Sequence, residues 1–320
     1  MIEETIEFAR NAHKAELHMH LEGALTPELF LKFATRNNKD IPYKTVEEIR
    51  EKYLFTNLED FINVYIEGFQ SLATTQDYNE LFDDYCEHAV SDNVVHTEIF
   101  TEAQGVPMIG MELPDMMDAC VDGIERWSKK GLEILLIPTF LRHLSEREAL
   151  ESLDLLEPYY KHISAIGLAA VELGHPPNKF KALFAKAREL GFKLVAHAGE
   201  EGPPEYVWQA IDELGVDRID HGNRAIEDPV LVARLARDQI PLTMCPLSNL
   251  CLCVVDSLEE HQAKRFLDAG VKVTINSDDP AYFGGYINDN FEQIIRAQQL
   301  DLSDVEQLIT NSLESAFSPA

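Results

Sequence analysis

Residues 193–221 read KLVAHAGEEGPPEYVWQAIDELGVDRIDH, and this stretch contains the pattern that decides the fold. A short apolar run at 193–197 is followed by a helical pattern at 205–214 that ends at Gly215, and a second apolar run follows at 218–221. Both runs are too apolar for strands with one solvated face, which is typical of parallel strands covered by helices. The stretch therefore predicts a strand–helix–strand unit of a parallel sheet.

The same alternation extends along most of the chain. From the second run onward the runs begin about 22 to 39 residues apart, close to the 31 or so expected of eight units in about 250 residues. This spacing favours an α/β protein with a (β/α)8 TIM barrel. The alternative, a doubly wound open sheet, normally has a glycine-rich turn after its first strand, where this chain has His18-Met19-His20. The expected strands are residues 15–20, 94–100, 133–140, 163–171, 193–197, 218–221, 241–245 and 271–276.

The connection between the first two strands is longer than the others. It contains amphipathic helical patterns at 58–72 and 78–90, so we expect a helical insertion at about residues 26–90. Insertions after barrel strands lie over the end of the barrel where active sites form, and this one is interpreted either as a lid or as a structural pad. No linker or internal repeat divides the chain, so residues 1–320 are expected to form one barrel domain.

The composition is that of a globular protein with a large acidic surplus. Of the 320 residues, 45% are hydrophobic and 26% are charged, which disfavours disorder. The net charge of −29 repels phosphate backbones and anionic lipid, so we expect neither nucleic acid nor a membrane as a partner. The five cysteines lack disulfide spacing and no signal-like apolar run occurs, so a cytoplasmic location is expected. The sequence does not predict the oligomeric state.

Histidine and aspartate side chains follow several of the predicted strands. His18 and His20 stand two residues apart in the first strand, so both side chains point to the same face. Because the carboxyl ends of all barrel strands meet at one mouth, we expect the candidates from different strands to converge there. Imidazole nitrogen and carboxylate oxygen suit Zn²⁺, and a catalytic zinc keeps one position for water. The other candidates, each after its own apolar strand, are His197, His221, Asp278 and Asp279.

Four short motifs give the chain a family resemblance. HMHLEG at 18–23, HAGE at 197–200, DHG at 220–222 and SDDP at 277–280 occur in this order. Together they resemble the adenosine/adenine deaminase family of the amidohydrolase superfamily over nearly the whole chain. The resemblance implies the same barrel, hydrolytic deamination of a small-molecule purine and one Zn²⁺ per chain. The residues that resemble the family's zinc ligands are His18, His20, His197 and Asp278.

The resemblance also implies roles in the chemistry. Glu200 resembles the acid that protonates purine N1, which lets C6 become tetrahedral without full negative charge on the ring. His221 resembles the general base that orients and deprotonates the attacking water. Asp279 resembles the partner of N7, and Gly174 is a candidate for a backbone N–H near N3. Asp278 is also expected to pass a proton toward the leaving amine, so that ammonia departs.

Longer motifs resemble the adenine deaminase branch of the family. Glu22 stands where members that act on the nucleoside generally have Asp, and its extra methylene is expected to intrude on space for a ribose. Glu172 is expected to accept a hydrogen bond from the free N9–H. Ala169-Ala170-Val171 departs from the polar residues of adenine-specific relatives, which leaves adenosine and N6-substituted adenine as alternative substrates. The motifs are GHPPNKF at 174–180, AGEEGPPEY at 198–206 and DDPAYFGGY at 278–286.

Other interpretations of the polar residues have less support. Binuclear relatives have a lysine at the end of the fourth strand, where this chain has none. His96-Thr97-Glu98 matches the His-x-Glu of another zinc deaminase class, but the Pro-Cys-x-x-Cys partner is missing. Cys245, Cys251 and Cys253 are expected to pack in the structure without binding a metal. A different amidohydrolase reaction and a barrel without catalysis are the alternatives to deamination.

Overall fold

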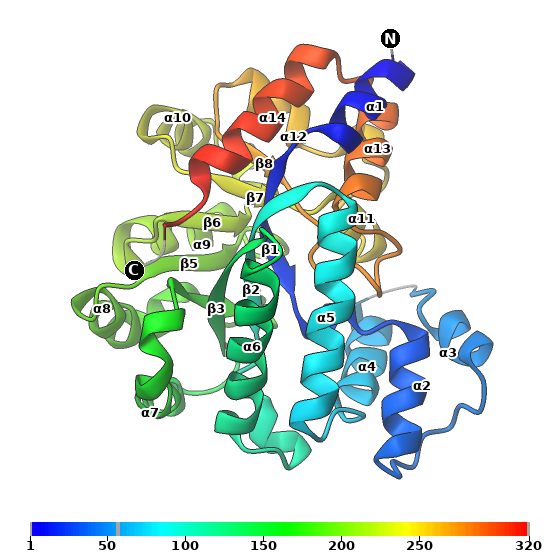
Figure 1. Cartoon of the computed structure of the whole chain (residues 1–320). Helices are drawn as coiled ribbons and strands as arrows, with labels where there is room; N and C mark the ends of the chain where they lie inside the picture. Colours follow the sequence, from blue (N-terminus) through cyan, green and yellow to red (C-terminus); the bar gives the residue numbers. More distant parts are fainter. Residues whose placement is uncertain (1, 56–57, 319–320) are drawn as a thin grey trace.

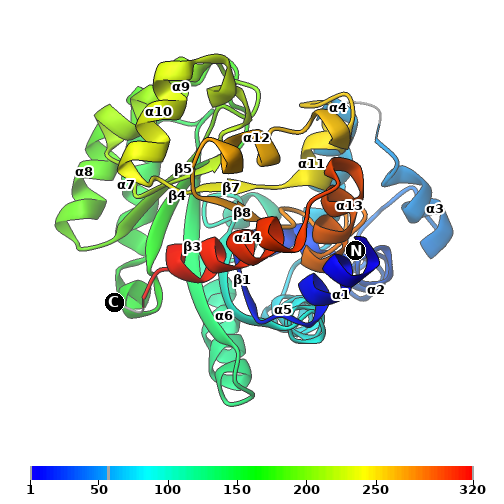
Figure 2. The same cartoon turned by 90° about the horizontal axis from the view of Figure 1, so that it is seen from above.

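The computed structural model describes residues 2–55 and 58–318, and its sheet has eight parallel strands. Each strand pairs with the next along the chain, and a parallel bridge between Met19 and Asp278 joins the end of the sheet to its beginning. Figures 1 and 2 show these strands surrounded by helices, so the predicted (β/α)8 barrel is confirmed. The strands are β1 (Lys14–His20), β2 (Val94–Thr101), β3 (Glu133–Leu141), β4 (Ala165–Ala169), β5 (Lys193–Ala198), β6 (Arg218–His221), β7 (Leu242–Met244) and β8 (Val273–Ile275).

Three strands are shorter at both ends than the sequence predicts. β4 ends at Ala169, since Ala170 has a φ of 73°, in the left-handed region that interrupts a strand. β7 and β8 end at Met244 and Ile275. The segments that follow β4 and β8 contribute residues to the site.

Helices connect the strands around the outside of the barrel. The predicted helix at 205–214 is divided into α9 (Pro204–Gln209) and a π-helical turn, Ala210–Leu214. Short 3₁₀ helices cover Glu22–Ala24, Val106–Ile109, Glu157–His162, Pro177–Phe180, Asn223–Glu227 and Leu258–Glu260. The α-helices other than those of the first connection are α1 (Ile2–Asn11), α6 (Leu113–Ser128), α7 (Glu146–Leu155), α8 (Lys181–Glu189), α9 (Pro204–Gln209), α10 (Pro229–Asp238), α11 (Pro246–Cys251), α12 (Ala263–Asp268), α13 (Ile287–Gln298) and α14 (Leu302–Ser315).

The first connection contains α2 (Pro27–Arg36), α3 (Val46–Lys52), α4 (Leu58–Phe69) and α5 (Thr75–Ser91). Helix α5 packs against α6 and β2 and so lies in the outer ring, whereas α2, α3 and α4 lie beside the carboxyl-terminal end of β1 (Figure 1). The part of this segment that extends beyond the ring is thus α2 to α4. The division of the chain into one domain with an insertion at about 26–90 stays a prediction.

The amino-terminal end of the barrel is covered by the end of the chain. Helix α14 lies across the strands in Figure 2 and contacts β1 and β8. Ser312 Oγ accepts a hydrogen bond from Ala15 N at 3.1 Å, and Asn311 Nδ2 donates to Val273 O at 2.9 Å. Inside this end, Arg218 pairs with Glu98 at 2.7 Å, and both side chains are buried. The chemistry therefore has to take place at the opposite, carboxyl-terminal end.

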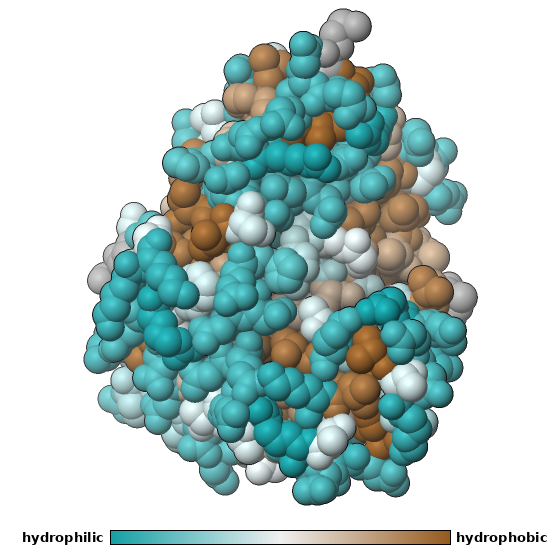
Figure 3. Space-filling view, turned by 45° about the vertical axis from the view of Figure 1, so that its right-hand side comes forward, coloured by the Kyte–Doolittle hydropathy of each residue, from teal (hydrophilic) through white to brown (hydrophobic). Residues whose placement is uncertain are grey.

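The surface agrees with the acidic composition. Figure 3 shows hydrophilic residues over most of one face, with smaller hydrophobic groups between them. Among the described residues, no helix is long and apolar enough to cross a membrane.

Candidate active site

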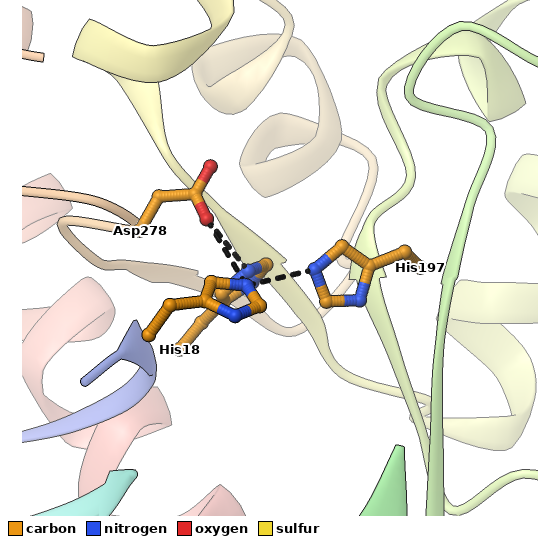
Figure 4. Close-up of side chains that lie close together, drawn as sticks. His18, His197 and Asp278 are labelled. Atoms are coloured by element: carbon orange, nitrogen blue, oxygen red, sulfur yellow. Dashed lines mark hydrogen bonds and ion pairs between the residues drawn. The ribbon is translucent and has the colours of Figure 1, made fainter. Parts of the chain in front are cut away.

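The four candidate metal ligands lie together at the carboxyl-terminal ends of β1, β5 and β8. One ligand atom from each lies within 4.8 Å of the others, and all four residues are buried. Nε2 of His18 lies 3.2 Å from Oδ1 of Asp278, and Nε2 of His20 lies 3.4 Å from the same oxygen. Nε2 of His20 also lies 3.2 Å from Nε2 of His197. Figure 4 shows His18, His197 and Asp278 pointing toward a common centre.

This group of donors fits a zinc ion. Three imidazole nitrogens and one carboxylate oxygen form a donor set that zinc prefers. Nε2 of His18 is buried without a hydrogen-bond partner, and Nε2 of His20 and His197 face each other. Because a buried polar atom without a partner costs about 1–3 kcal/mol, a cation among these donors stabilises the arrangement.

Thr243 and Asp220 hold the far sides of two of the imidazole rings. Thr243 Oγ1 donates to Asp220 Oδ1 at 2.9 Å, so its lone pair accepts from Nδ1 of His18, also at 2.9 Å. Oδ2 of Asp220 lies 3.4 Å from Nδ1 of His197. Burial alone raises the pKa of Asp220, but the contact with His197 and the nearby His18 lower it below its ordinary range. With Nδ1 protonated in both rings, each Nε2 has a free lone pair for a metal.

We expect Asp220→Asn to weaken zinc binding by about 10- to 100-fold, because an amide orients and polarises the His197 ring less well than a carboxylate does. Competition with a chelator of known affinity measures the zinc Kd, and circular dichroism verifies the fold. Asp122→Asn, at an exposed position of α6, is the matched control and is expected to keep the wild-type Kd. An unchanged zinc Kd in the Asp220 variant would contradict the role of Asp220.

His221 lies beside the metal-binding group, at the end of β6. Its Nε2 lies 3.5 Å from Oε2 of Glu200 and 3.8 Å from Oδ2 of Asp278. Nδ1 accepts from the side-chain amide of Asn249 at 3.3 Å, and the orientation of that amide is set by His261, which lies 3.0 Å from its oxygen. A neutral His221 therefore carries its proton on Nε2. This arrangement favours the orienting part of the predicted role over the removal of a proton from water.

Glu200 and Asp279 are acids that line the cavity beside the metal-binding group. Burial, and next the neighbouring Asp278 carboxylate, raise the pKa of both groups well above their ordinary values. Each can therefore donate a hydrogen bond or a proton to a ring nitrogen. The Asp279 carboxyl lies against Gly23, where a Cβ would be 2.2 Å from its Oδ1, so a larger residue at 23 would displace it.

Left-handed backbone conformations shape the mouth of the barrel. His221, Asp278 and Ala170 have φ values of 65°, 64° and 73°, which are uncommon for residues with a side chain. Such conformations are found at sites where the surrounding structure compensates their cost. The register of β1 also shifts between Glu16 and Met19, as in a β-bulge, next to His18. Neither feature has a signature in the sequence.

A cavity of about 300 Å³ lies over the metal-binding group, within the size range of small-molecule sites. Helix α4 forms one wall, which places the predicted insertion directly over the site. The backbone after β4 forms a second wall, which is apolar. Polar side chains at the cavity include Glu102, Glu200, Glu201 and Asp279. The apolar wall residues are Phe61, Ile62, Tyr65, Ile66 and Phe69 from α4 and Ala169, Ala170 and Val171 from the chain after β4.

Three predicted substrate-binding residues lie elsewhere. Glu22 does not line the cavity, because the 3₁₀ turn after β1 directs its carboxyl to the Tyr78 hydroxyl at 3.1 Å. Glu172 accepts the backbone N–H groups of Gly199, Glu201 and Gly202 at 2.6–2.8 Å, so it holds the loop that carries Glu200. Gly174 has a φ of 80° and stands outside the cavity lining, where the strand backbone has already turned at Ala170.

Sequence reasoning missed several residues that support the site. Arg142, at the end of β3, donates to the carbonyl oxygen of His197 at 2.7 Å and is fully buried. Cys245, expected only to pack, lies with His221 and Asp278 in a second group whose ligand atoms are within 4.8 Å of one another. The sequence did contain a signal for Asp220. An aspartate inside an apolar strand needs a buried polar partner, so its position alone predicts a contact with another polar side chain.

Comparisons with known proteins agree with this geometry. A relative named adenine deaminase from Sphingopyxis alaskensis is 48% identical over 98% of this chain and 93% of its own length. The crystal structure of adenine deaminase from Arthrobacter aurescens, 43% identical, matches with a TM-score of 0.93 over 95% of this chain and 94% of that chain. An amidohydrolase from Burkholderia ambifaria with bound Zn is 27% identical, with a TM-score of 0.88 over 98% and 88%. A family model described as adenosine deaminase matches residues 13–320, and the chain therefore belongs to the adenosine deaminase family.

Proposed function

We propose that this protein is a zinc-dependent aminohydrolase that converts adenine and water into hypoxanthine and ammonia. The observation that carries the proposal is that a cavity of about 300 Å³ lies at a group of four metal donors and is lined by two acids with raised pKa values, Glu200 and Asp279. The relatives named adenine deaminase support adenine as the substrate. One zinc ion per chain and a cytoplasmic location belong to the same proposal.

Zinc bound by His18, His20, His197 and Asp278 would lower the pKa of a coordinated water to about 7. The neighbouring residues of this chain do the rest. Nε2 of His221 orients the attacking water toward C6 of the purine. Oδ2 of Asp278, which lies 3.8 Å from that nitrogen, accepts one proton of the water and passes it to the leaving amine.

Glu200 and Asp279 act on the two rings of the base. Glu200 donates its proton to N1, so that C6 becomes tetrahedral without full negative charge on the ring, and Asp279 donates a hydrogen bond to N7. N1 of hypoxanthine keeps the proton from Glu200, one proton of the water leaves with ammonia, and the other returns to Glu200. Atoms and charge balance over the cycle.

The cavity walls explain how the site excludes water. Phe61 of α4 packs on Phe283, with ring centroids 4.8 Å apart, and Tyr65 packs on Tyr282 at 5.6 Å. Through these contacts, helix α4 packs against the segment that follows Asp278 and Asp279. A purine enclosed by this wall meets few waters other than the one that reacts.

A second candidate substrate is an adenine with a small apolar substituent on N6, because apolar side chains of α4 line much of the cavity. N6-methyladenine is the simplest probe of this candidate, and methylamine is then the amine released.

Rates of amine release from a panel of purines test the function. We expect kcat/KM for adenine to exceed that for adenosine by about 10²-fold or more, because a ribose on N9 removes the N–H that a site for the free base would bind. N6-methyladenine and a cyclic amide, dihydrouracil, complete the panel. A preference for adenosine would contradict the adenine assignment, and amide hydrolysis without release of ammonia from any 6-aminopurine would contradict deamination.

A further inference from the structure

Glu102 is a buried acid at the cavity that takes no part in the chemistry above. It follows β2, lines the cavity and is 9% exposed. Its Oε1 accepts from the Thr139 hydroxyl at 3.2 Å, and no ion pair with a described basic residue holds the carboxyl. Burial, followed by the nearby Glu22 carboxyl, raises the pKa of Glu102 to about 8. A polar group so placed needs a partner, and the cavity is where a ligand can supply one.

The order of the strands gives the place of Glu102 around the cavity. Glu102 follows β2 and Asp279 follows β8, and β1 lies between these two strands. Adjacent strands are about 4.8 Å apart, so both acids belong to one side of the mouth. Glu200 follows β5 and Ala170 follows β4, which form the opposite side. The Asp279 carboxyl is within electrostatic reach of both Glu102 and Glu200, as expected for a group between them.

Adenine has two nitrogen-bearing edges that match these two sides. When C6 points to the metal-binding group, N1 and N3 lie along one edge, and N7 and N9 lie along the other. With Glu200 at N1 and Asp279 at N7, N3 faces the wall around Ala170, and N9 extends toward the side of β1 and β2. The acid that lines the cavity on that side is Glu102. Glu22 does not line the cavity, and its Oε1 accepts a hydrogen bond from the backbone N–H of Glu102.

Among the described residues, no hydrogen bond holds the second carboxyl oxygen of Glu102. Thr139 contacts Oε1, whereas Oε2 lies next to Gly105. A Cβ at position 105 would be 3.4 Å from Oε2 and 3.0 Å from the ring of Phe69, so the glycine keeps this corner of the cavity open.

We propose that Glu102 recognises the free base by accepting the N9–H of adenine at a carboxyl oxygen, and that it thereby selects the base over N9-substituted purines. The inference rests on the proposed function and assigns to Glu102 the contact that the sequence predicts for Glu172. A substituent on N9 removes the donor and leaves a buried acid without a partner, which a polar site rejects strongly.

Two substitutions and two substrates test the proposal. Wild-type kcat/KM is expected to be about 10²-fold or more higher for adenine than for 9-methyladenine. Glu102→Met keeps the length of the side chain but removes both oxygens, so the preference is expected to fall below about tenfold, mainly through a higher KM for adenine. Glu102→Gln keeps a carbonyl oxygen as acceptor and is expected to retain most of the preference. Glu189→Gln, at an exposed position of α8 outside the cavity lining, is the matched control whose preference should stay at the wild-type value.

The outcomes separate this inference from the function itself. Wild-type protein that releases no ammonia from adenine overturns the proposed function. Wild-type protein that deaminates both substrates equally, or a Glu102→Met variant that keeps the full preference, overturns the role of Glu102 alone. Zinc content and circular dichroism verify each variant, and Glu102→Leu replaces the Met variant if that one does not fold. Calorimetric titration of hypoxanthine and 9-methylhypoxanthine gives the same comparison without turnover.

Discussion

Glu200→Gln is expected to bind zinc as the wild type does and to lose adenine turnover by about 10²- to 10⁴-fold. The amide has nearly the size of the acid and can donate a hydrogen bond to N1, but it has no proton to transfer. The tetrahedral carbon at C6 would then place negative charge on a ring nitrogen in a buried site, where charge is costly. Single-turnover rates of ammonia release measure the effect on chemistry without product release.

An exposed acid gives the control for Glu200. Glu189 lies on α8, outside the cavity lining. Glu189→Gln is expected to keep the turnover of the wild type. If Glu200→Gln were equally active, the proton for N1 would have to come from another group.

Removal of the metal is expected to abolish ammonia release, and one equivalent of Zn²⁺ per chain is expected to restore it. The apoprotein should also be less stable, because an ion that binds only the folded state stabilises it by about 4 kcal/mol when present at 1,000 times its Kd. Calorimetry with and without chelator measures this difference as a shift of Tm, and elemental analysis gives the stoichiometry.

His197→Ala tests the same site without a chelator. It removes one donor from the group and is expected to abolish stoichiometric zinc binding and turnover together. His13→Ala, at an exposed position before β1, is the control that should keep both. Turnover by a metal-free protein, or zinc binding that survives the loss of His197, would refute the metal centre as described.

The sequence predicted the barrel because its determinants are local. Short apolar runs that alternate with helical patterns define parallel strands wherever they occur, and their spacing matched the repeat of an eight-stranded barrel. The metal donors could be found for a related reason. His18, His197 and Asp278 each stand at the end of an apolar run, and a closed ring of parallel strands brings all such ends together.

The substrate contacts could not be found in this way, because each depends on where one side chain points. Glu172 and Glu22 look equally available in the sequence. In the structure one holds the backbone of residues 199–202 and the other lies behind the wall, under Tyr78. Glu102 had no signature, since it follows a strand that carries no metal donor.

The sequence alone therefore determined the order of strands and helices, the residues of the candidate metal-binding group and the family to which the chain belongs. Tertiary structure decided which acids have raised pKa values, which nitrogen of each imidazole is free, and which carboxyl groups reach the cavity. These properties depend on burial and on contacts between strands up to 260 residues apart, such as Leu17 of β1 with Asn276 after β8 at 2.8 Å, a separation of 259. The sequence contains the residues that make such contacts. It does not show the left-handed backbone conformations of Ala170, His221 and Asp278, which set the directions of the side chains at the mouth of the barrel.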